Sequence, residues 1–156
     1  MLKLKHILIP KISKAVILIL LAVNCSKDQN TFLPYVRVNL PIPLATNNHL
    51  MIPRNSILFQ NYGVKGVIVV CVNPELNQYL AFDACCPYEK DYSGAVEIEP
   101  VRTEPNKVLS SAFVGICNKC GSEFILASGQ PIKGPATHYL QNYNVIASYQ
   151  YLTVTN

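Results

Sequence analysis

Short apolar segments, separated by proline, glycine and polar residues, recur along most of the chain. Between residues 35 and 40, apolar positions alternate with Arg37 and Asn39, which is the two-residue period of a half-buried β-strand. The strongest strand signal is the β-branched run at 64–72, and residues 79–82 follow it after a loop as the second arm of a hairpin. Further strands are predicted around residues 96–101, 108–109, 113–116, 124–126 and 143–154.

The spacing of these segments predicts an all-β fold. Successive strands lie roughly 8–12 residues apart with turn residues between them, as in a β-sandwich or a small barrel. Pro41 and Pro43 interrupt the first strand, as prolines do at the edge of a sheet. No segment has the periodicity of a helix of three turns, and the sequence contains no internal repeat.

The first 24 residues have the pattern of a secretory signal peptide. Lysines come first, and an unbroken apolar run follows at 15–23. At about 1.5 Å per residue this run covers roughly half of a bilayer core of about 30 Å, which is too short for a spanning helix. Residues 21–25 (LAVNC) resemble a bacterial lipoprotein cleavage box with Cys25 as the lipidated residue, although Asn24 departs from it. An ordinary signal peptide, with Cys25 unmodified, is the alternative.

The lipoprotein resemblance divides the chain into three parts. Residues 1–24 would be removed, residues 25–33 would form a lipidated N-terminus and polar tether, and residues 34–156 would form the β domain. Residues 26–28 also resemble the short polar signals that follow the cysteine in some Bacteroidetes lipoproteins. We therefore expect a lipid-anchored membrane protein of the bacterial cell envelope, facing the periplasm or the cell surface.

The net positive charge of the chain lies in the predicted signal peptide. The chain has 13 Lys and Arg against 9 Asp and Glu, but four lysines and no acidic residue precede Cys25. The rest of the chain is neutral, with nine basic and nine acidic residues. A neutral domain lacks the basic surface that nucleic-acid binding needs, so we exclude a nucleic-acid partner.

The cysteines of the β domain are its main candidates for chemistry. Cys71 lies within the strongest predicted strand and is expected to be a buried, inert thiol. Cys85-Cys86 and the Cys117-x-x-Cys120-Gly motif each follow a predicted strand, so both pairs are expected at loop tips. The second motif resembles half of a zinc ribbon, but adjacent cysteines cannot make the matching chelating turn. A thioredoxin-like site lacks its βαβ context, and disulfides are common in exported proteins.

The order of these features resembles the Rieske iron–sulfur domain family over residues 64–154. The predicted hairpin leads into CPY at 86–88, where the family has a Cys-x-His loop. CNKCGS at 117–122 matches the family's Cys-x-x-His-Gly-Ser, and a Gly-Pro-Ala segment at 134–136 matches the loop that covers the cluster. The resemblance implies a fold of stacked antiparallel sheets, three in number, with the site at two loop tips.

The resemblance also assigns candidate ligands. Cys86 and Cys117 fall on the two cysteine positions, whereas Tyr88 and Cys120 fall on the two histidine positions, so both ligand histidines are replaced. Cys85 is an alternative ligand. The residues that match the family's supports for the cluster loops are Ser122, Phe124, Gly134 and Pro135.

One hypothesis is an electron carrier with a [2Fe–2S] cluster held by Cys86, Cys117, Cys120 and either Tyr88 or Cys85. Thiolates add charge where imidazole is neutral, so such a cluster would lie nearer the about −400 mV of all-thiolate clusters than the roughly −150 to +300 mV of Rieske centres. The resemblance implies transfer to a separate redox protein partner. No Ser-His-Asp or paired-carboxylate pattern suggests an enzyme.

Two other hypotheses stay open. The first is a structural or interaction module of the same fold with no cofactor, in which the resemblance implies a Cys86–Cys117 disulfide and allows a second bridge between Cys85 and Cys120. The second is a zinc-binding module that uses the same cysteines.

Overall fold

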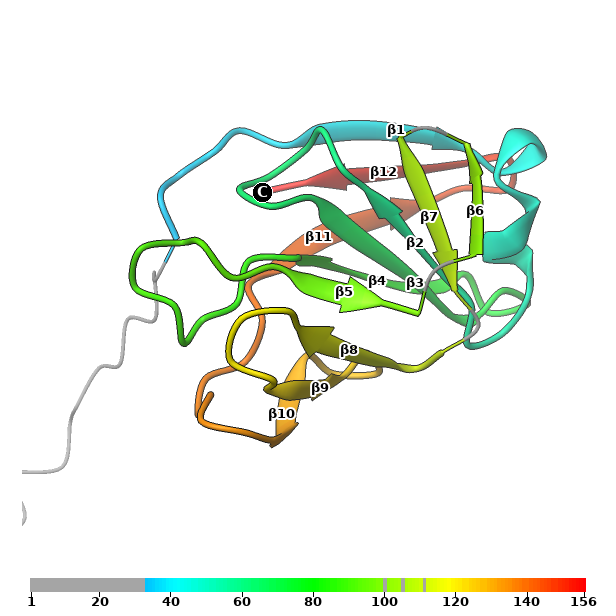
Figure 1. Cartoon of the computed structure of the whole chain (residues 1–156). Helices are drawn as coiled ribbons and strands as arrows, with labels where there is room; N and C mark the ends of the chain where they lie inside the picture. The colour runs from blue at the N-terminus through cyan, green and yellow to red at the C-terminus, as the bar shows by residue number, and fades with distance from the viewer. Residues whose placement is uncertain (1–32, 100, 105, 111) are drawn as a thin grey trace, which may run out of the picture. The chain divides into compact units, whose positions relative to one another are not determined.

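The chain folds into two antiparallel β-sheets in the computed structural model, which describes residues 33–156 except for 100, 105 and 111 (Figure 1). The predicted signal peptide at 1–24, Cys25, and all but the last residue of the predicted tether at 25–33 lie outside the described residues. In the described part of the chain, no helix has the length and apolar character that crossing a membrane requires.

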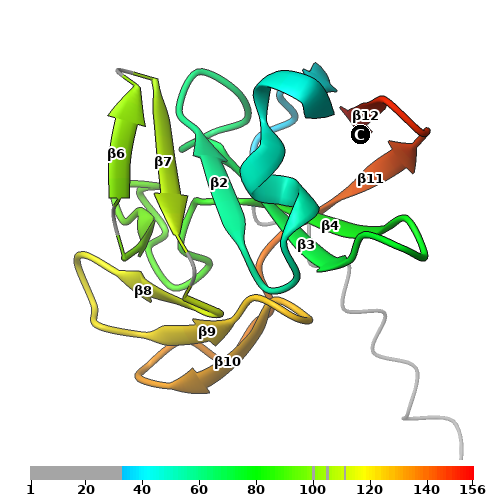
Figure 2. The same ribbon diagram turned by 90° about the vertical axis from the view of Figure 1, so that its right-hand side faces the viewer.

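The larger sheet has eight strands, and the smaller sheet has four. Figures 1 and 2 show the smaller sheet packed below the larger one. The order of the larger sheet is β1 (Asn39–Pro43), β12 (Tyr151–Thr155), β11 (Asn142–Ala147), β4 (Gln78–Asp83), β3 (Val67–Asn73), β2 (Ser56–Phe59), β7 (Lys107–Ser110) and β6 (Val101–Glu104). The order of the smaller sheet is β10 (Gln130–Lys133), β9 (Glu123–Ile125), β8 (Val114–Cys117) and β5 (Val96–Ile98).

The predicted all-β, antiparallel fold is confirmed, but the expected three sheets are two. The difference arises at β11, which pairs with β4 through Asn142 and Tyr143 and with β12 through residues 144–147. This strand therefore joins two groups of strands into one hydrogen-bonded sheet. The helices of the described residues are two short 3₁₀ segments, η1 (Leu44–Thr46) and η2 (Asn48–Met51), so the prediction that no long helix is present holds for this part of the chain.

Several predicted strands have different limits in the structure. Pro41 and Pro43 lie inside β1, where they are tolerated because β1 is at the edge of the sheet. The segment 96–101 is divided between β5 and β6, which belong to different sheets, and the segment 143–154 forms the β11–β12 hairpin. β2 and β10 were not predicted.

The β3–β4 hairpin lies at the centre of the fold, and β3 is buried on both faces. Ile68 and Val70 belong to an apolar cluster between the two sheets, whereas Val67 and Val69 belong to a cluster on the other face. The second cluster includes apolar residues of β1 and β12, so the larger sheet curls over itself. Burial on both sides explains why the sequence at 67–71 is a continuous apolar run rather than an alternating one.

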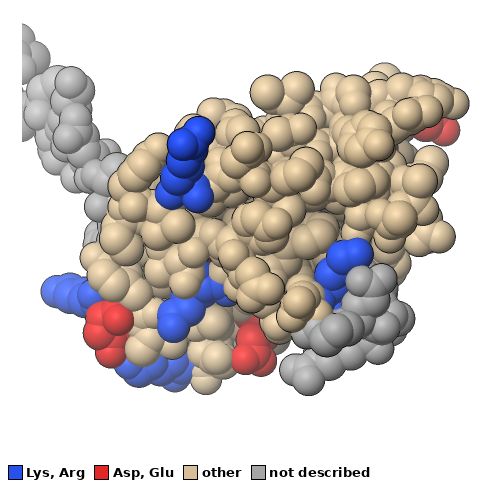
Figure 3. Space-filling model, turned by 90° about the horizontal axis from the view of Figure 1, so that it is seen from above, with Lys and Arg blue, Asp and Glu red and all other residues tan. Residues whose placement is uncertain are grey.

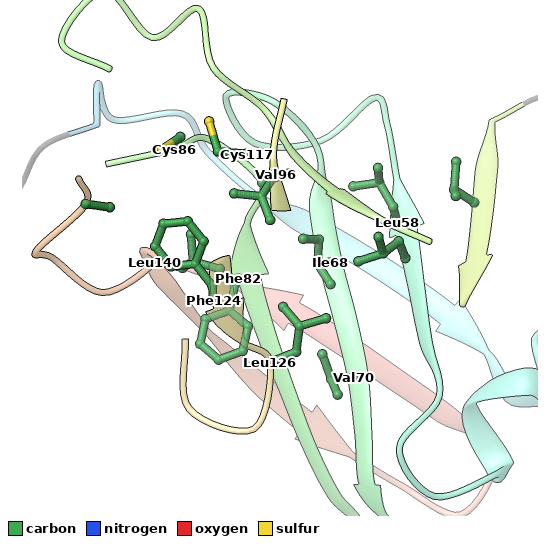
Figure 4. Packing of buried hydrophobic residues seen from close by; sticks show 14 residues of the cluster. Leu58, Ile68, Val70, Phe82, Cys86, Val96, Cys117, Phe124, Leu126 and Leu140 are labelled. Carbon is green, nitrogen blue, oxygen red and sulfur yellow. The ribbon is translucent and has the colours of Figure 1, made fainter. Parts of the chain in front are cut away.

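The apolar cluster between the sheets ends at two cysteines. Figure 4 shows Cys86 and Cys117 side by side at its edge, next to Val96. Both cysteines are buried. The two sheets thus bring the two predicted loop tips together.

Candidate metal centre

Three cysteine sulfurs, two from loops and one from the end of β8, form a compact group, which we call the thiol triad. The Sγ atoms of Cys86, Cys117 and Cys120 lie within 4.8 Å of one another. The Cys86 and Cys120 sulfurs are 3.7 Å apart. Cys86 lies in the loop at 84–95, between β4 and β5, and Cys120 lies in the loop at 118–122, between β8 and β9. The predicted meeting of the two cysteine segments at two loop tips is therefore observed.

The first loop starts from a buried carboxylate at the end of β4. Asp83 has no exposed surface, and its oxygens accept hydrogen bonds from the Val64 amide (2.7 Å), the Lys65 amide (3.2 Å), the Cys85 amide (2.8 Å) and the Tyr143 hydroxyl (2.7 Å). Four donors satisfy the buried charge. Asp83 therefore fixes the start of the loop that carries Cys86, and the sequence reasoning missed it.

The same loop closes tightly around Cys86 at Gly94. The Cys86 amide donates to the Gly94 carbonyl oxygen (3.0 Å). A Cβ atom at position 94 would lie 3.0 Å from the Cys117 sulfur and 3.2 Å from the Cys86 Cβ. Only glycine allows this approach without displacing its neighbours. The sequence marks this position only as part of a Ser-Gly pair, which is common to many turns.

The second loop is a tight turn between β8 and β9. The Gly121 amide donates to the Cys117 carbonyl oxygen (3.0 Å), and the Cys117 amide donates to the Ser122 carbonyl oxygen (2.8 Å). Gly121 has a φ of 70°, a left-handed conformation that favours glycine. The turn brings the sulfurs of Cys117 and Cys120 to the same side, which accounts for the glycine of the Cys-x-x-Cys-Gly motif.

Ser122 connects this turn to the Gly-Pro-Ala segment. Its buried Oγ accepts a hydrogen bond from the Ala136 amide (3.0 Å) and lies 3.0 Å from the Cys120 sulfur. Since the oxygen accepts from Ala136, its own proton is available to the sulfur. Gly134, with a φ of 97°, lies so close to Ser122 that a Cβ there would be 2.5 Å from the Ser122 Cα.

The other two predicted support residues have different surroundings. Phe124 is buried in the apolar cluster between the sheets, where it packs with residues such as Phe82 (Figure 4). Pro135 is exposed. The structure therefore places Ser122 beside the triad, Gly134 against Ser122, and Phe124 in the core.

The thiols of the triad differ in acidity. Burial raises the pKa of Cys86 far above its usual range. Partial burial also acts to raise the pKa of Cys120, but hydrogen bonds from the side chain and backbone of Ser122, and from the two other cysteines, outweigh it and lower the pKa. Cys120 therefore has a lower pKa than Cys86.

The two candidate fourth ligands lie differently from the triad. Cys85 is buried but is not part of the group of three. Its backbone forms an isolated bridge with Ala95, and burial, reinforced by Asp83, raises its pKa to about 12. Tyr88 is 50% exposed. Its backbone forms a hydrogen bond with the Cys86 thiol, and this bond acts to lower the pKa of Cys86.

These positions do not fit a complete [2Fe–2S] site. Such a cluster needs four protein ligands, two on each iron. The resemblance would place Cys86 and Cys120 on different irons, yet these sulfurs are 3.7 Å apart, a separation that suits two ligands of one ion. Among the described residues that carry thiol, imidazole or carboxylate groups, three ligands converge and not four.

Polar contacts also join the two loops at the surface. The Lys119 ammonium pairs with Asp91 (3.1 Å) and Glu89 (3.3 Å) of the first loop. The Asn118 side chain accepts a hydrogen bond from the Ala95 amide (3.1 Å) and donates one to Glu97 (2.9 Å). Exposed ion pairs contribute little to stability, so these contacts add little to the energy that holds the loops together.

The remaining described cysteine, Cys71, is not part of the thiol triad. Cys71 is fully buried in β3, as predicted, and burial raises its pKa to about 11. All five described cysteines are thiols in the structure, so the Cys86–Cys117 and Cys85–Cys120 disulfides stay predictions. On the face drawn in Figure 3, most of the surface is uncharged.

Of the comparisons with known proteins, the one with solved structures found similar proteins. No protein-family model matches, and no curated protein matches by sequence. Among solved structures, "Complex of reduced oxygenase and oxidized ferredoxin in carbazole 1,9a-dioxygenase" is similar at 19% identity and a TM-score of 0.46, over 77% of this chain and 94% of that chain.

Two further structures are similar to this chain. The ferredoxin of carbazole 1,9a-dioxygenase from Nocardioides aromaticivorans IC177 has 16% identity and a TM-score of 0.44, over 77% of this chain and 95% of that chain. The Sphingomonas yanoikuyae B1 ferredoxin has 15% identity and a TM-score of 0.36, over 58% of this chain and 74% of that chain. Similarity at this level assigns no function and no residue role to this chain.

Proposed function

We propose that the chain is a small electron-transfer module of Rieske-like architecture with a metal–thiolate centre, and that it serves a separate redox protein rather than acting as an enzyme. The observation that carries the proposal is the thiol triad of Cys86, Cys117 and Cys120, whose sulfurs lie within 4.8 Å of one another at the tips of two loops. Thiols that converge in this way are suited to soft metal ions.

The surrounding residues support a charged, partly dry centre. Cys86 and Cys117 are buried, so water is excluded from one side, while Cys120 is partly exposed. The Ser122 hydroxyl is placed to donate a hydrogen bond to the Cys120 sulfur. Hydrogen bonds to ligand sulfurs stabilise negative charge and tune the potential of iron–sulfur centres. A [2Fe–2S] cluster is the finer form of this proposal, and it would require Tyr88 or Cys85 to move toward the triad.

We also propose that the domain is exported and lipid-anchored at the bacterial cell envelope. The signal-like segment at 1–24 and the lipoprotein-like residues at 21–25 support this proposal. A lipid anchor on Cys25 would hold the domain at the membrane surface without spanning it. The tether that follows is short, so a redox partner would be sought at or near the membrane.

Metal analysis with a redox titration of anaerobically purified full-length protein tests the proposed function. We expect bound iron, reversible one-electron reduction, and loss of both in a variant with Cys86, Cys117 and Cys120 all changed to Ser. The matched control is Cys71→Ser, which changes a buried cysteine of β3 that is not part of the triad. Protein that binds no metal, or that keeps its metal in the triple variant, would overturn the proposal.

A second function is favoured by the closeness of the same sulfurs. In an oxidising compartment, thiols 3.7 Å apart are prone to form a disulfide, and the domain would then be a structural or interaction module without a cofactor. Three thiols can form one disulfide and leave one thiol. Peptide mapping of aerobically purified protein under non-reducing conditions would show Cys86 joined to Cys117 or Cys120, whereas finding all three as thiols would exclude this form.

A further inference from the structure

We propose that the thiol triad binds one tetrahedral metal ion, and that the fourth coordination position is open to a nitrogen or sulfur donor from another molecule. This inference rests on the proposed function, since it concerns the same centre. It differs from a two-iron cluster in metal stoichiometry, in the number of protein ligands and in its capacity to accept an outside ligand.

The spacing of the sulfurs supports a single ion. Two thiolates on one tetrahedral ion, with metal–sulfur bonds of about 2.3 Å, are about 3.8 Å apart. The observed separation of the Cys86 and Cys120 sulfurs is 3.7 Å, and the whole triad lies within 4.8 Å. One ion can therefore reach all three sulfurs after side-chain shifts of no more than about 1 Å.

The surroundings of the triad leave the fourth position to an external donor. Among the described residues, no histidine, carboxylate or further cysteine joins the group of three. The Ser122 oxygen is already an acceptor for the Ala136 amide and is placed to donate its proton to the Cys120 sulfur. Three protein ligands with an external fourth ligand are the usual arrangement where a metal ion must bind another molecule.

The exposure of the triad indicates where the external donor enters. Cys86 is fully buried and Cys117 is 1% exposed, whereas Cys120 is partly exposed. The buried side is closed by the apolar cluster and by Gly94, which lies against the Cys117 sulfur. The open position therefore faces solvent on the Cys120 side, where a small thiol, an imidazole or a side chain of a partner protein can reach the metal.

Iron and zinc both suit a soft three-thiolate site, so the shared chemistry is a tetrahedral thiolate-bound divalent ion. The metal present after native purification distinguishes them. One iron per chain would support both the proposed electron-transfer function and the single-ion inference. Zinc has no redox chemistry, so one zinc per chain would support the inference and overturn the proposed function.

Titration of the reduced full-length protein with Co²⁺ under anaerobic conditions tests the inference. We expect saturation at one Co²⁺ per chain, with thiolate charge-transfer bands and the visible bands of tetrahedral cobalt. Each of the variants Cys86→Ser, Cys117→Ser and Cys120→Ser should weaken or abolish these bands. Cys85→Ala is the matched control, because Cys85 is buried beside Cys86 but lies outside the triad, and it should leave the spectrum unchanged.

Addition of imidazole or a small thiol then tests the open position. We expect the visible cobalt bands to shift in a saturable way, since the external donor replaces water on the metal. A spectrum that does not respond, or that changes in Cys85→Ala or Tyr88→Phe, would identify a fourth protein ligand and overturn the inference. Two irons and two sulfides per chain would overturn it while sparing the proposed function, and failure to bind any metal would overturn both.

Discussion

Ser122 links the acidity of the Cys120 thiol to the Gly-Pro-Ala segment at 134–136. Its Oγ is 3.0 Å from both the Cys120 sulfur and the Ala136 amide nitrogen. Ser122→Ala should raise the pKa of Cys120, because the hydroxyl that stabilises the thiolate is lost. In metal-free, reduced protein, alkylation of Cys120 followed by mass spectrometry should then begin at higher pH than in the wild type.

The control for this prediction is Ser128→Ala, which removes an exposed hydroxyl that accepts a hydrogen bond from the Gln130 amide. This change should leave the pH profile of Cys120 alkylation unaltered. An unchanged profile in Ser122→Ala would show that the hydroxyl does not stabilise the thiolate. The same variant leaves the Ala136 amide without its acceptor, so we expect a loss of about 1–3 kcal/mol in the free energy of unfolding.

Asp83 holds the first residues of the loop that carries Cys86 in place. Each oxygen of the Asp83 carboxylate accepts two of the four hydrogen bonds. In Asp83→Asn, one of these oxygens becomes an NH₂ group, so two donors lose their acceptor whichever way the amide is oriented. We expect the free energy of unfolding to fall by about 2–4 kcal/mol, since buried donors lose a charged acceptor. Urea denaturation of Asp83→Asn, with the exposed Glu75→Gln as control, measures this loss.

At the scale of the elements, Gly94 sets how closely the two loops approach. A methyl group at this position would lie 2.5 Å from the Glu89 Cγ and 3.0 Å from the Cys117 sulfur. Gly94→Ala should therefore push the loops apart and reduce metal affinity about 10-fold or more, the scale typical of changes next to metal ligands. Competition with a chromophoric chelator measures the affinity. Ser93→Ala, which adds no atom near the sulfurs, should leave the affinity within a few-fold of the wild type.

Strands with a strong local signal were predictable, and strands that depend on their neighbours were not. The β-branched run of β3 and the apolar residues of β4 predicted a hairpin, which the structure confirms. β2 has four residues, all buried between β3 and β7, and β10 contains a proline and exposed positions. Their membership of a sheet comes from pairing with adjacent strands, which a local pattern does not encode.

The candidate site was predictable in its cysteines but not in its ligand number. Their positions after successive strands placed both pairs at loop tips. Cys85 and Cys86 are adjacent on an extended segment, so their side chains take opposite directions, and Cys85 is left outside the triad. That orientation, like the roles of Asp83 and Gly94, depends on the conformation of the whole loop, which the sequence does not specify.

At the scale of the whole molecule, the proposed lipid anchor on Cys25 would decide where the domain works. Cys25→Ala should move the protein from the membrane fraction to the soluble periplasmic or secreted fraction, because acylation requires the cysteine thiol. Fractionation with immunoblotting measures the distribution, and Cys71→Ala serves as a control that should stay in the membrane. A Cys25→Ala protein that remains in the membrane after its signal peptide has been cleaved would show that this residue is not the anchor.

X-ray absorption spectroscopy at the metal edge of natively purified, full-length protein tests the central claim most directly. A metal held by Cys86, Cys117 and Cys120 predicts three sulfur neighbours at about 2.3 Å, with one lighter donor or an external sulfur completing the shell. The sulfur contribution should decrease in Cys120→Ser and persist in Cys85→Ala. A first shell of oxygen and nitrogen alone, or a spectrum unaffected by Cys120→Ser, would contradict a metal centre at the thiol triad.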